Sequence, residues 1–134
     1  MTLVIDASIA AKWILPEPES DRAEALRNDE PVLIAPELIV AELGNAVWKR
    51  ARRQEITAAK AVEAISHAMR MIDRLYPLEG LAIRATAIAI SLNHPIYDCF
   101  YLALAERERL KIATADDRLA NLARVLGTVE AVRL

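Results

Sequence analysis

The feature that most constrains the fold is a set of short, wholly apolar runs that alternate with longer segments of helical character. Three of these runs are LVI at residues 3–5, VLIA at 32–35 and KIAT at 111–114. Runs without polar alternation are typical of strands buried on both faces of a sheet. Such strands, separated by helices, predict right-handed crossovers and a parallel sheet. We therefore expect an α/β fold of three layers, an α/β/α sandwich whose central sheet is mostly parallel.

Two weaker runs are expected at the edges of this sheet. VEAVRL at 129–134 alternates more, and RLYPL at 74–78 contains a proline that excludes a central strand. The helices fill the intervals, with Pro36 in a first turn, Thr57 as an N-cap and Asn93 as a terminator. Their predicted ranges are 17–28, 36–53, 57–73, 80–92, 95–109 and 116–125.

Composition and charge bound the class of protein. The chain has 134 residues, 54% hydrophobic and 27% charged, which suits one globular domain over residues 1–134. No apolar run reaches the ~20 residues of a membrane span, and the N-terminus does not resemble a signal peptide. The single cysteine, Cys99, excludes an internal disulfide and a cysteine-rich metal site, so we expect a cytoplasmic protein. The net charge of −2 gives no overall basic footprint for nucleic acid.

Two acidic residues follow predicted strands. Asp6 comes directly after LVI, and Asp116 follows KIAT after one intervening residue. The carboxyl ends of parallel strands share one edge of the sheet, where sites of open α/β sheets form, so both carboxylates should lie there. Each can also be the N-cap of the helix that follows, and the sequence leaves both interpretations open.

Two further acids stand among apolar residues within predicted helices. Glu42 has Leu38 and Ala46 on its own helical face, although it can also lie at the boundary of an amphipathic helix. Asp98 lies in HPIYDCFYLALAE, residues 94–106, a helix that is apolar nearly all round. We expect Asp98 to point into packing, where an unpaired carboxylate is costly and needs a partner.

A divalent cation resolves the repulsion that four converging carboxylates would suffer without interleaved lysine or arginine. Oxygen ligands without histidine or cysteine suit Mg²⁺ or Mn²⁺. Such an ion lowers the pKa of bound water and produces a nucleophile for phosphodiester hydrolysis. From these residues alone we predict a metal-dependent phosphodiesterase.

The chain resembles PIN-domain ribonucleases of the VapC toxin type, which occur in bacterial toxin–antitoxin pairs. The resemblance covers nearly the whole chain and rests on four motifs in family order: VIDASIAAKWILPEPES, APELIVAELGNAVWK, HPIYDCFYLALAE and TADDRLA. It implies Mg²⁺-dependent endoribonuclease activity, with Asp6, Glu42, Asp98 and Asp116 as the catalytic, metal-binding acids. It also implies a homodimer and an antitoxin partner, for which apolar helix surface within residues 81–92 is available.

Supporting roles follow from the same resemblance. Ser8 and Thr114 match small hydroxyl residues that support such pockets, and Asn45 lies one turn after Glu42. Asp117 is either a ligand through water or a first-turn acid, and Asp116 is preferred as the primary acid because it comes first after the strand.

The candidate RNA contacts are Lys12, Lys49, Arg50 and Arg53. For the cations in WKRARR, residues 48–53, compensation of the helix dipole is the competing interpretation. Packing explains the two tryptophans, Trp13 and Trp48, better than base stacking does. Both histidines, His67 and His94, are interpreted as structural, because metal-activated water needs no general base.

Other functions stay open. Acids at strand ends also build signalling pockets, but Glu42 and Asp98 lie within predicted helices, which disfavours a non-enzymatic phosphoacceptor. A degenerate module that only binds an antitoxin is disfavoured by four intact acids. A DNA-directed nuclease of the same metal chemistry is not separated from a ribonuclease, because recognition of the 2′-hydroxyl leaves no motif.

Overall fold

The sheet has five strands, and a computed structural model describes all of residues 1–134. The strand order is β3-β2-β1-β4-β5, and every neighbouring pair is parallel. The prediction of a parallel sheet with its two weaker runs at the edges is confirmed. The strands are β1 (Thr2–Ile5), β2 (Val32–Pro36), β3 (Arg74–Tyr76), β4 (Ile112–Thr114) and β5 (Ala131–Arg133).

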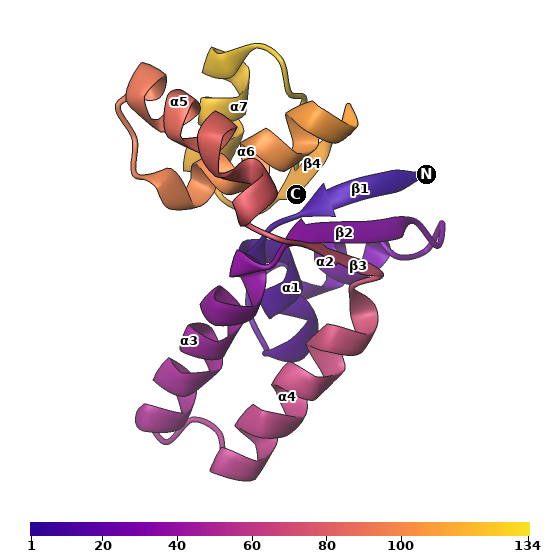
Figure 1. The fold of residues 1–134 in the computed structure, drawn as a ribbon. Helices are drawn as coiled ribbons and strands as arrows, with labels where there is room; N and C mark the ends of the chain where they lie inside the picture. The colour runs from indigo at the N-terminus through magenta and orange to yellow at the C-terminus, as the bar shows by residue number, and fades with distance from the viewer.

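Helices cover both faces of this sheet. Figure 1 shows α5, α6 and α7 over one face and α1 to α4 over the other, so the predicted α/β/α sandwich is confirmed. No helix combines the length and the apolarity that crossing a bilayer requires. The helices are α1 (Ala7–Ile14), α2 (Ser20–Ala25), α3 (Leu38–Arg52), α4 (Ala58–Met71), the 3-10 helix η1 (Glu79–Leu81), α5 (Ala82–Leu92), α6 (Ile96–Glu108) and α7 (Asp117–Leu126).

The helix predictions hold best where a capping residue is present. Thr57 caps α4, its side chain accepting from the Lys60 N–H at 3.1 Å. Asn93 ends α5 in the left-handed region with φ 49°, and Gly127 ends α7 with φ 80°. These residues supply the terminal hydrogen bonds or the backbone conformation that a helix end needs.

Three predictions near the N-terminus were wrong in detail. Residues 7–14 form α1, a helix that the capping alternative for Asp6 allowed but that the predicted helix ranges did not include. The helix predicted at 17–28 shrinks to the six residues of α2, because Glu19 before it takes a left-handed conformation with φ 68°. Pro36 ends β2, in register with Tyr76 of β3, and α3 begins two residues later.

The main core lies on both sides of the central strands and contains 28 buried residues. Val4, Ile5 and Ile112, from the adjacent strands β1 and β4, are fully buried, which explains the absence of polar alternation in their sequences. The two buried polar side chains of the chain, Asp6 and Thr114, stand at the carboxyl ends of these same strands. The fold therefore places buried polar chemistry at one edge of its sheet.

Candidate active site

Asp6 lies at the junction of β1 and α1 and is 5% exposed. Its Oδ1 caps α1 by accepting from the Ile9 N–H at 3.2 Å, and it also accepts from the Ser8 hydroxyl at 2.6 Å. Its Oδ2 accepts from the Thr114 hydroxyl at 2.5 Å. The capping interpretation is therefore correct, and the same carboxylate is tied to the end of β4.

Ser8 and Thr114 join the ends of β1 and β4. The Ser8 Oγ accepts from the Ala115 N–H at 2.9 Å, and the Thr114 Oγ1 accepts from the Asp116 N–H at 2.9 Å. Asp116 in turn caps α7, its Oδ1 accepting from the Arg118 N–H at 2.8 Å. This network brings Asp116 to the edge of the sheet that Asp6 occupies.

Glu42 reaches the same region from α3. It is half-buried, and its Oε1 accepts from the hydroxyl of Tyr101, a residue of α6 that is 1% exposed, at 2.5 Å. Burial raises the pKa of Glu42; the Tyr101 hydrogen bond opposes this rise, and the charges of Asp98 and Asp6 add to it. The Tyr101 contact was missed from sequence, because 59 residues separate the partners and no local pattern marks it.

Asp98 lies in the first turn of α6, with its side chain 27% exposed. It points less into packing than expected, because the buried part of α6 begins one residue later, at Cys99. A carboxylate near a helix N-terminus is also favoured by the helix dipole. The Oδ2 of Asp98 lies 2.8 Å from the Nε2 of His94. His94 was predicted to be only structural; the four-residue spacing from Asp98 was the signal for this contact.

The four acids share a region of concentrated negative charge. Burial raises the pKa of Asp6; hydrogen bonds from Ser8, Thr114 and the Ile9 N–H oppose the rise, and the charge of Asp116 adds to it. None of the four forms an ion pair with lysine or arginine; Asp98 pairs with a histidine alone.

The four carboxylates offer only oxygen ligands and have no lysine or arginine partner, which fits the chemistry of Mg²⁺ or Mn²⁺. The donors are not assembled, however: no three Asp, Glu, His or Cys side chains lie close enough together to hold a metal ion as they stand. Hydrogen bonds hold two of the carboxylates, with Tyr101 on Glu42 and His94 on Asp98. Binding a shared ion therefore requires side-chain movement within the cluster.

The two acids of TADDRLA take different directions. Asp117 is 87% exposed, and its Oδ1 accepts from the Nε of Arg133 on β5 at 2.7 Å. Asp116 is the one of the pair whose charge raises the pKa of Asp6. Asp117 therefore belongs to the outer edge of the sheet in this structure.

A groove of about 490 Å³ opens beside the acids between α1 and α3, and we call it the α1–α3 groove. It contains all four predicted RNA-contact cations, and Asn45 shares it with Glu42. Trp48 and Trp13 lie outside it; Trp13 is packed, its indole N–H donating to the Ala23 carbonyl at 2.9 Å, whereas Trp48 is 53% exposed. The lining residues are Ala7, Ser8, Ala11, Lys12, Leu15, Glu17, Glu42, Asn45, Ala46, Lys49, Arg50, Arg53 and Ala115.

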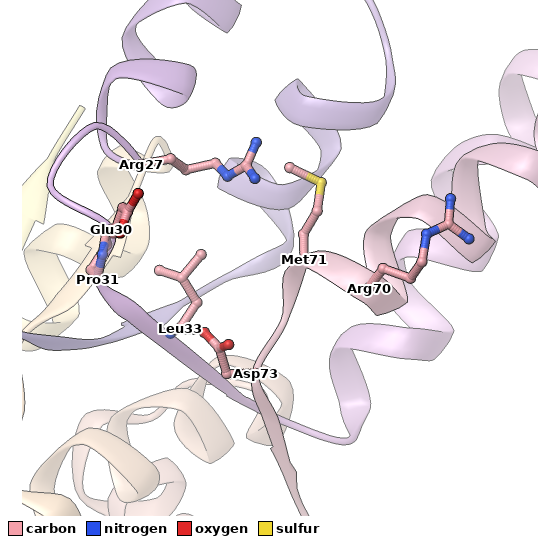
Figure 2. A pocket seen from close by; sticks show the side chains of 7 residues that line it. All are labelled: Arg27, Glu30, Pro31, Leu33, Arg70, Met71 and Asp73. Atoms are coloured by element: carbon pink, nitrogen blue, oxygen red, sulfur yellow. Dashed lines mark hydrogen bonds between the residues drawn. The ribbon is translucent and has the colours of Figure 1, made fainter.

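A second hollow, of about 290 Å³, lies near the beginning of β2, at the opposite end of the strands from the acids. Figure 2 shows charged groups of both signs around it. Three of them are engaged locally: Asp73 accepts from the Leu33 N–H at 2.7 Å, Arg70 donates to Ser66 at 2.8 Å, and Arg27 pairs with Glu24. We therefore assign no chemistry to it. It is lined by Arg27, Glu30, Pro31, Leu33, Arg70, Met71 and Asp73.

Comparisons with known proteins found similar sequences and similar folds. Ribonuclease VapC3 from Pyrobaculum aerophilum is 32% identical over 123 residues, covering 90% of this chain and 94% of that protein. The crystal structure of VapC20 from Mycobacterium tuberculosis, described as a sarcin-ricin loop cleaving toxin, has a TM-score of 0.69 and 18% identity, and covers 99% of this chain and 100% of that one.

A second structure has the same fold at lower identity. VapBC2 from Rickettsia felis, bound to a DNA fragment from its promoter, matches with a TM-score of 0.73 and 11% identity over 100% of this chain and 99% of that one. The PIN domain family model matches residues 3–125. Because that match spans most of the chain, and the sequence relative covers nearly all of it, the chain belongs to the PIN-domain family, with VapC ribonucleases as its relatives.

Proposed function

We propose that the protein is a Mg²⁺-dependent endoribonuclease, the toxin component of a type II toxin–antitoxin system. The observation that carries this proposal is a cluster of four carboxylates that influence one another's charge, without lysine or arginine partners, at the carboxyl edge of a parallel sheet in a PIN-domain chain. The names of the relatives support RNA as the substrate: VapC3 is a ribonuclease, and VapC20 cleaves the sarcin-ricin loop.

Asp6, Glu42, Asp98 and Asp116 would hold the ion, Mg²⁺ or Mn²⁺. When bound, it lowers the pKa of a water molecule and stabilises charge on the phosphodiester during hydrolysis. The protein contributes orientation. Each carboxylate has a fixed tether: hydroxyls on Asp6, the Tyr101 phenol on Glu42, His94 on Asp98 and a backbone N–H on Asp116. These contacts keep the carboxylates in one region, and movement of their side chains within the cluster would then bring them onto a shared ion.

The α1–α3 groove is the proposed path of the RNA strand. Lys12, Lys49, Arg50 and Arg53 line it beside Glu42. Lys49 and Arg53 are exposed and take part in no ion pair, so both are free to meet phosphates. Neutralising phosphates releases counterions, which supplies affinity without sequence specificity.

Cleavage of defined single-stranded RNA and DNA in Mg²⁺, Mn²⁺ or EDTA tests the proposal. We expect RNA cleavage that EDTA abolishes; cleavage of DNA alone would instead favour the DNA-directed nuclease, and full activity in EDTA would exclude the mechanism. Asp116→Asn should lose cleavage, because asparagine caps a helix as well as aspartate does but removes the charge. Asp117→Asn, the neighbouring control, should keep it.

An antitoxin and a second copy of the chain are the proposed protein partners. VapBC2 was solved as a VapBC complex, which supports the first. Exposed apolar side chains support the second: Ile83 and Ile90 of α5 are 90% and 77% exposed. Analytical ultracentrifugation should give the mass of a dimer. A monomer mass at high protein concentration would contradict the proposed dimer. The cytoplasmic location stays a prediction.

A further inference from the structure

Glu17 stands between two cations of the α1–α3 groove. Its Oε2 lies 3.4 Å from the Lys12 Nζ, and its Oε1 lies 3.5 Å from the Arg50 Nη2. Both separations exceed the ~2.7–2.9 Å of strong charge-assisted hydrogen bonds. One carboxylate thus partly neutralises two of the four cations of the groove, and it does so with loose contacts.

The two cations keep their places through other contacts. The Lys12 ammonium donates to the Pro18 carbonyl at 2.8 Å. The Arg50 guanidinium donates to the Pro16 carbonyl at 3.1 Å, and its Nε lies 3.3 Å from Glu55. These contacts hold the cations in the groove whether or not Glu17 is charged, so a purely structural role for its charge is unnecessary.

The backbone of Glu17 is also fixed independently of its side chain. Its N–H donates to the Ser20 Oγ at 3.2 Å, and the Ser20 hydroxyl donates back to the Glu17 carbonyl at 2.9 Å. This turn sets the carboxylate between the side chains of Lys12 and Arg50, which are only 10% and 23% exposed. Cations that are partly withdrawn from water attract an anion more strongly than fully exposed ones.

We propose that Glu17 is an internal stand-in for an RNA phosphate. Its carboxylate occupies the position between Lys12 and Arg50 that a phosphate of the substrate strand takes, and it must give way for the strand to bind fully. This inference rests on the proposed ribonuclease function. It assigns Glu17 the role of holding RNA affinity below the value that the four groove cations would otherwise give.

The expected effect follows from counterion release. Each phosphate neutralised on a single strand changes the slope of log K against log salt by about −0.7. Glu17→Gln keeps the shape of the side chain and frees one phosphate position. We therefore expect the slope to steepen by about 0.7. The affinity of Glu17→Gln for RNA, divided by that of the wild type, should then be about fivefold higher at 0.1 M salt than at 1 M salt.

The experiment is fluorescence anisotropy with a single-stranded RNA oligonucleotide in EDTA, across a salt series. Glu24→Gln is the matched control, because it removes the same charge from a residue that pairs with Arg27 outside the groove. We expect tighter binding for Glu17→Gln alone, and loss of the gain in Glu17→Gln combined with Lys12→Gln. The inference is overturned if a folded Glu17→Gln binds RNA no more tightly than the wild type. It is also overturned if neither the wild type nor Glu17→Gln binds RNA detectably.

Cleavage in Mg²⁺, measured separately, distinguishes this inference from the proposed function. If the wild type cleaves RNA but Glu17→Gln binds no better, only the role of Glu17 fails. If the wild type cleaves no RNA, the ribonuclease proposal fails, whatever the anisotropy shows.

Discussion

Replacing Tyr101 by phenylalanine removes one hydroxyl from the centre of the acidic cluster and keeps the ring. The phenol is 1% exposed and donates to the Glu42 carboxylate at 2.5 Å. A hydrogen bond to a charged group contributes about 1.5–3 kcal/mol. Glu42 is half-buried and keeps some contact with water, so we expect a loss of about 1.5–2 kcal/mol, the lower part of that range. For a chain of this size, Tm should fall by about 6–8 °C.

The sign of the pH dependence follows from the pKa of Glu42. Burial already raises that pKa, and the Tyr101 hydrogen bond opposes the rise, so Tyr101→Phe raises it further. A carboxyl whose pKa is higher in the folded than in the unfolded state loses stability as pH rises between the two values. The difference between the wild type and Tyr101→Phe should therefore be small at acid pH, grow as pH rises through the raised pKa of Glu42 in the folded wild type, and become constant once the carboxylate is charged in both folded proteins.

Urea unfolding in EDTA, repeated from acid to neutral pH, measures this difference. Tyr97→Phe is the control, because Tyr97 is 61% exposed and loss of its hydroxyl should cost less than ~0.5 kcal/mol. Adding Glu42→Gln should remove most of the pH dependence. A difference for Tyr101→Phe that is below ~0.5 kcal/mol, or constant with pH, would show that the Tyr101 hydrogen bond does not stabilise the charged form of Glu42.

Three further predictions concern residues that are not among the four acids. Two hydrogen bonds from Arg84, at 2.5 and 2.9 Å, lower the pKa of Glu106. Glu106→Gln should therefore lower the free energy of unfolding by about 0.5–1 kcal/mol at neutral pH. Urea unfolding should show this difference disappear as pH falls through the lowered pKa, which lies below 4.5. Gly44→Ala, within α3 and with free space around the new Cβ, should stabilise the protein by about 0.5–1 kcal/mol. Gly127→Ala, at φ 80°, should destabilise it by about 1–2 kcal/mol, and equal effects of the two glycine substitutions on Tm would contradict both.

The sheet could be predicted from sequence because its signal is local. The central strands are short apolar runs, and the burial of Val4 and Ile112 on both faces is what removes polar alternation. The ends of the strands then locate Asp6 and Asp116, since parallel strands share a carboxyl edge. Sequence position alone was sufficient for this half of the candidate site.

The other half depends on contacts between distant segments. Nothing near Glu42 in the sequence indicates that Tyr101 will donate to it, and nothing near Lys12 indicates that Glu17 also reaches Arg50. The exposure of Asp98 was mispredicted for a related reason: the periodicity describes a whole helix, whereas burial of α6 begins only after its first turn. Tertiary packing decides such features, and periodicity does not report it.

We propose that the Asp98 carboxylate serves catalysis and not folding. The decisive measurement is made on Asp98→Asn, with Tm in EDTA and RNA cleavage in Mg²⁺ determined on the same preparation. Asparagine can still bond to His94, and it removes a charge that raises the pKa of Glu42. We predict a stability within ~1 kcal/mol of the wild type and cleavage lower by at least ~100-fold, the size expected when several kcal/mol of metal-based stabilisation are lost. Cleavage at the wild-type rate, or a variant that no longer folds, would show that Asp98 does not have this role.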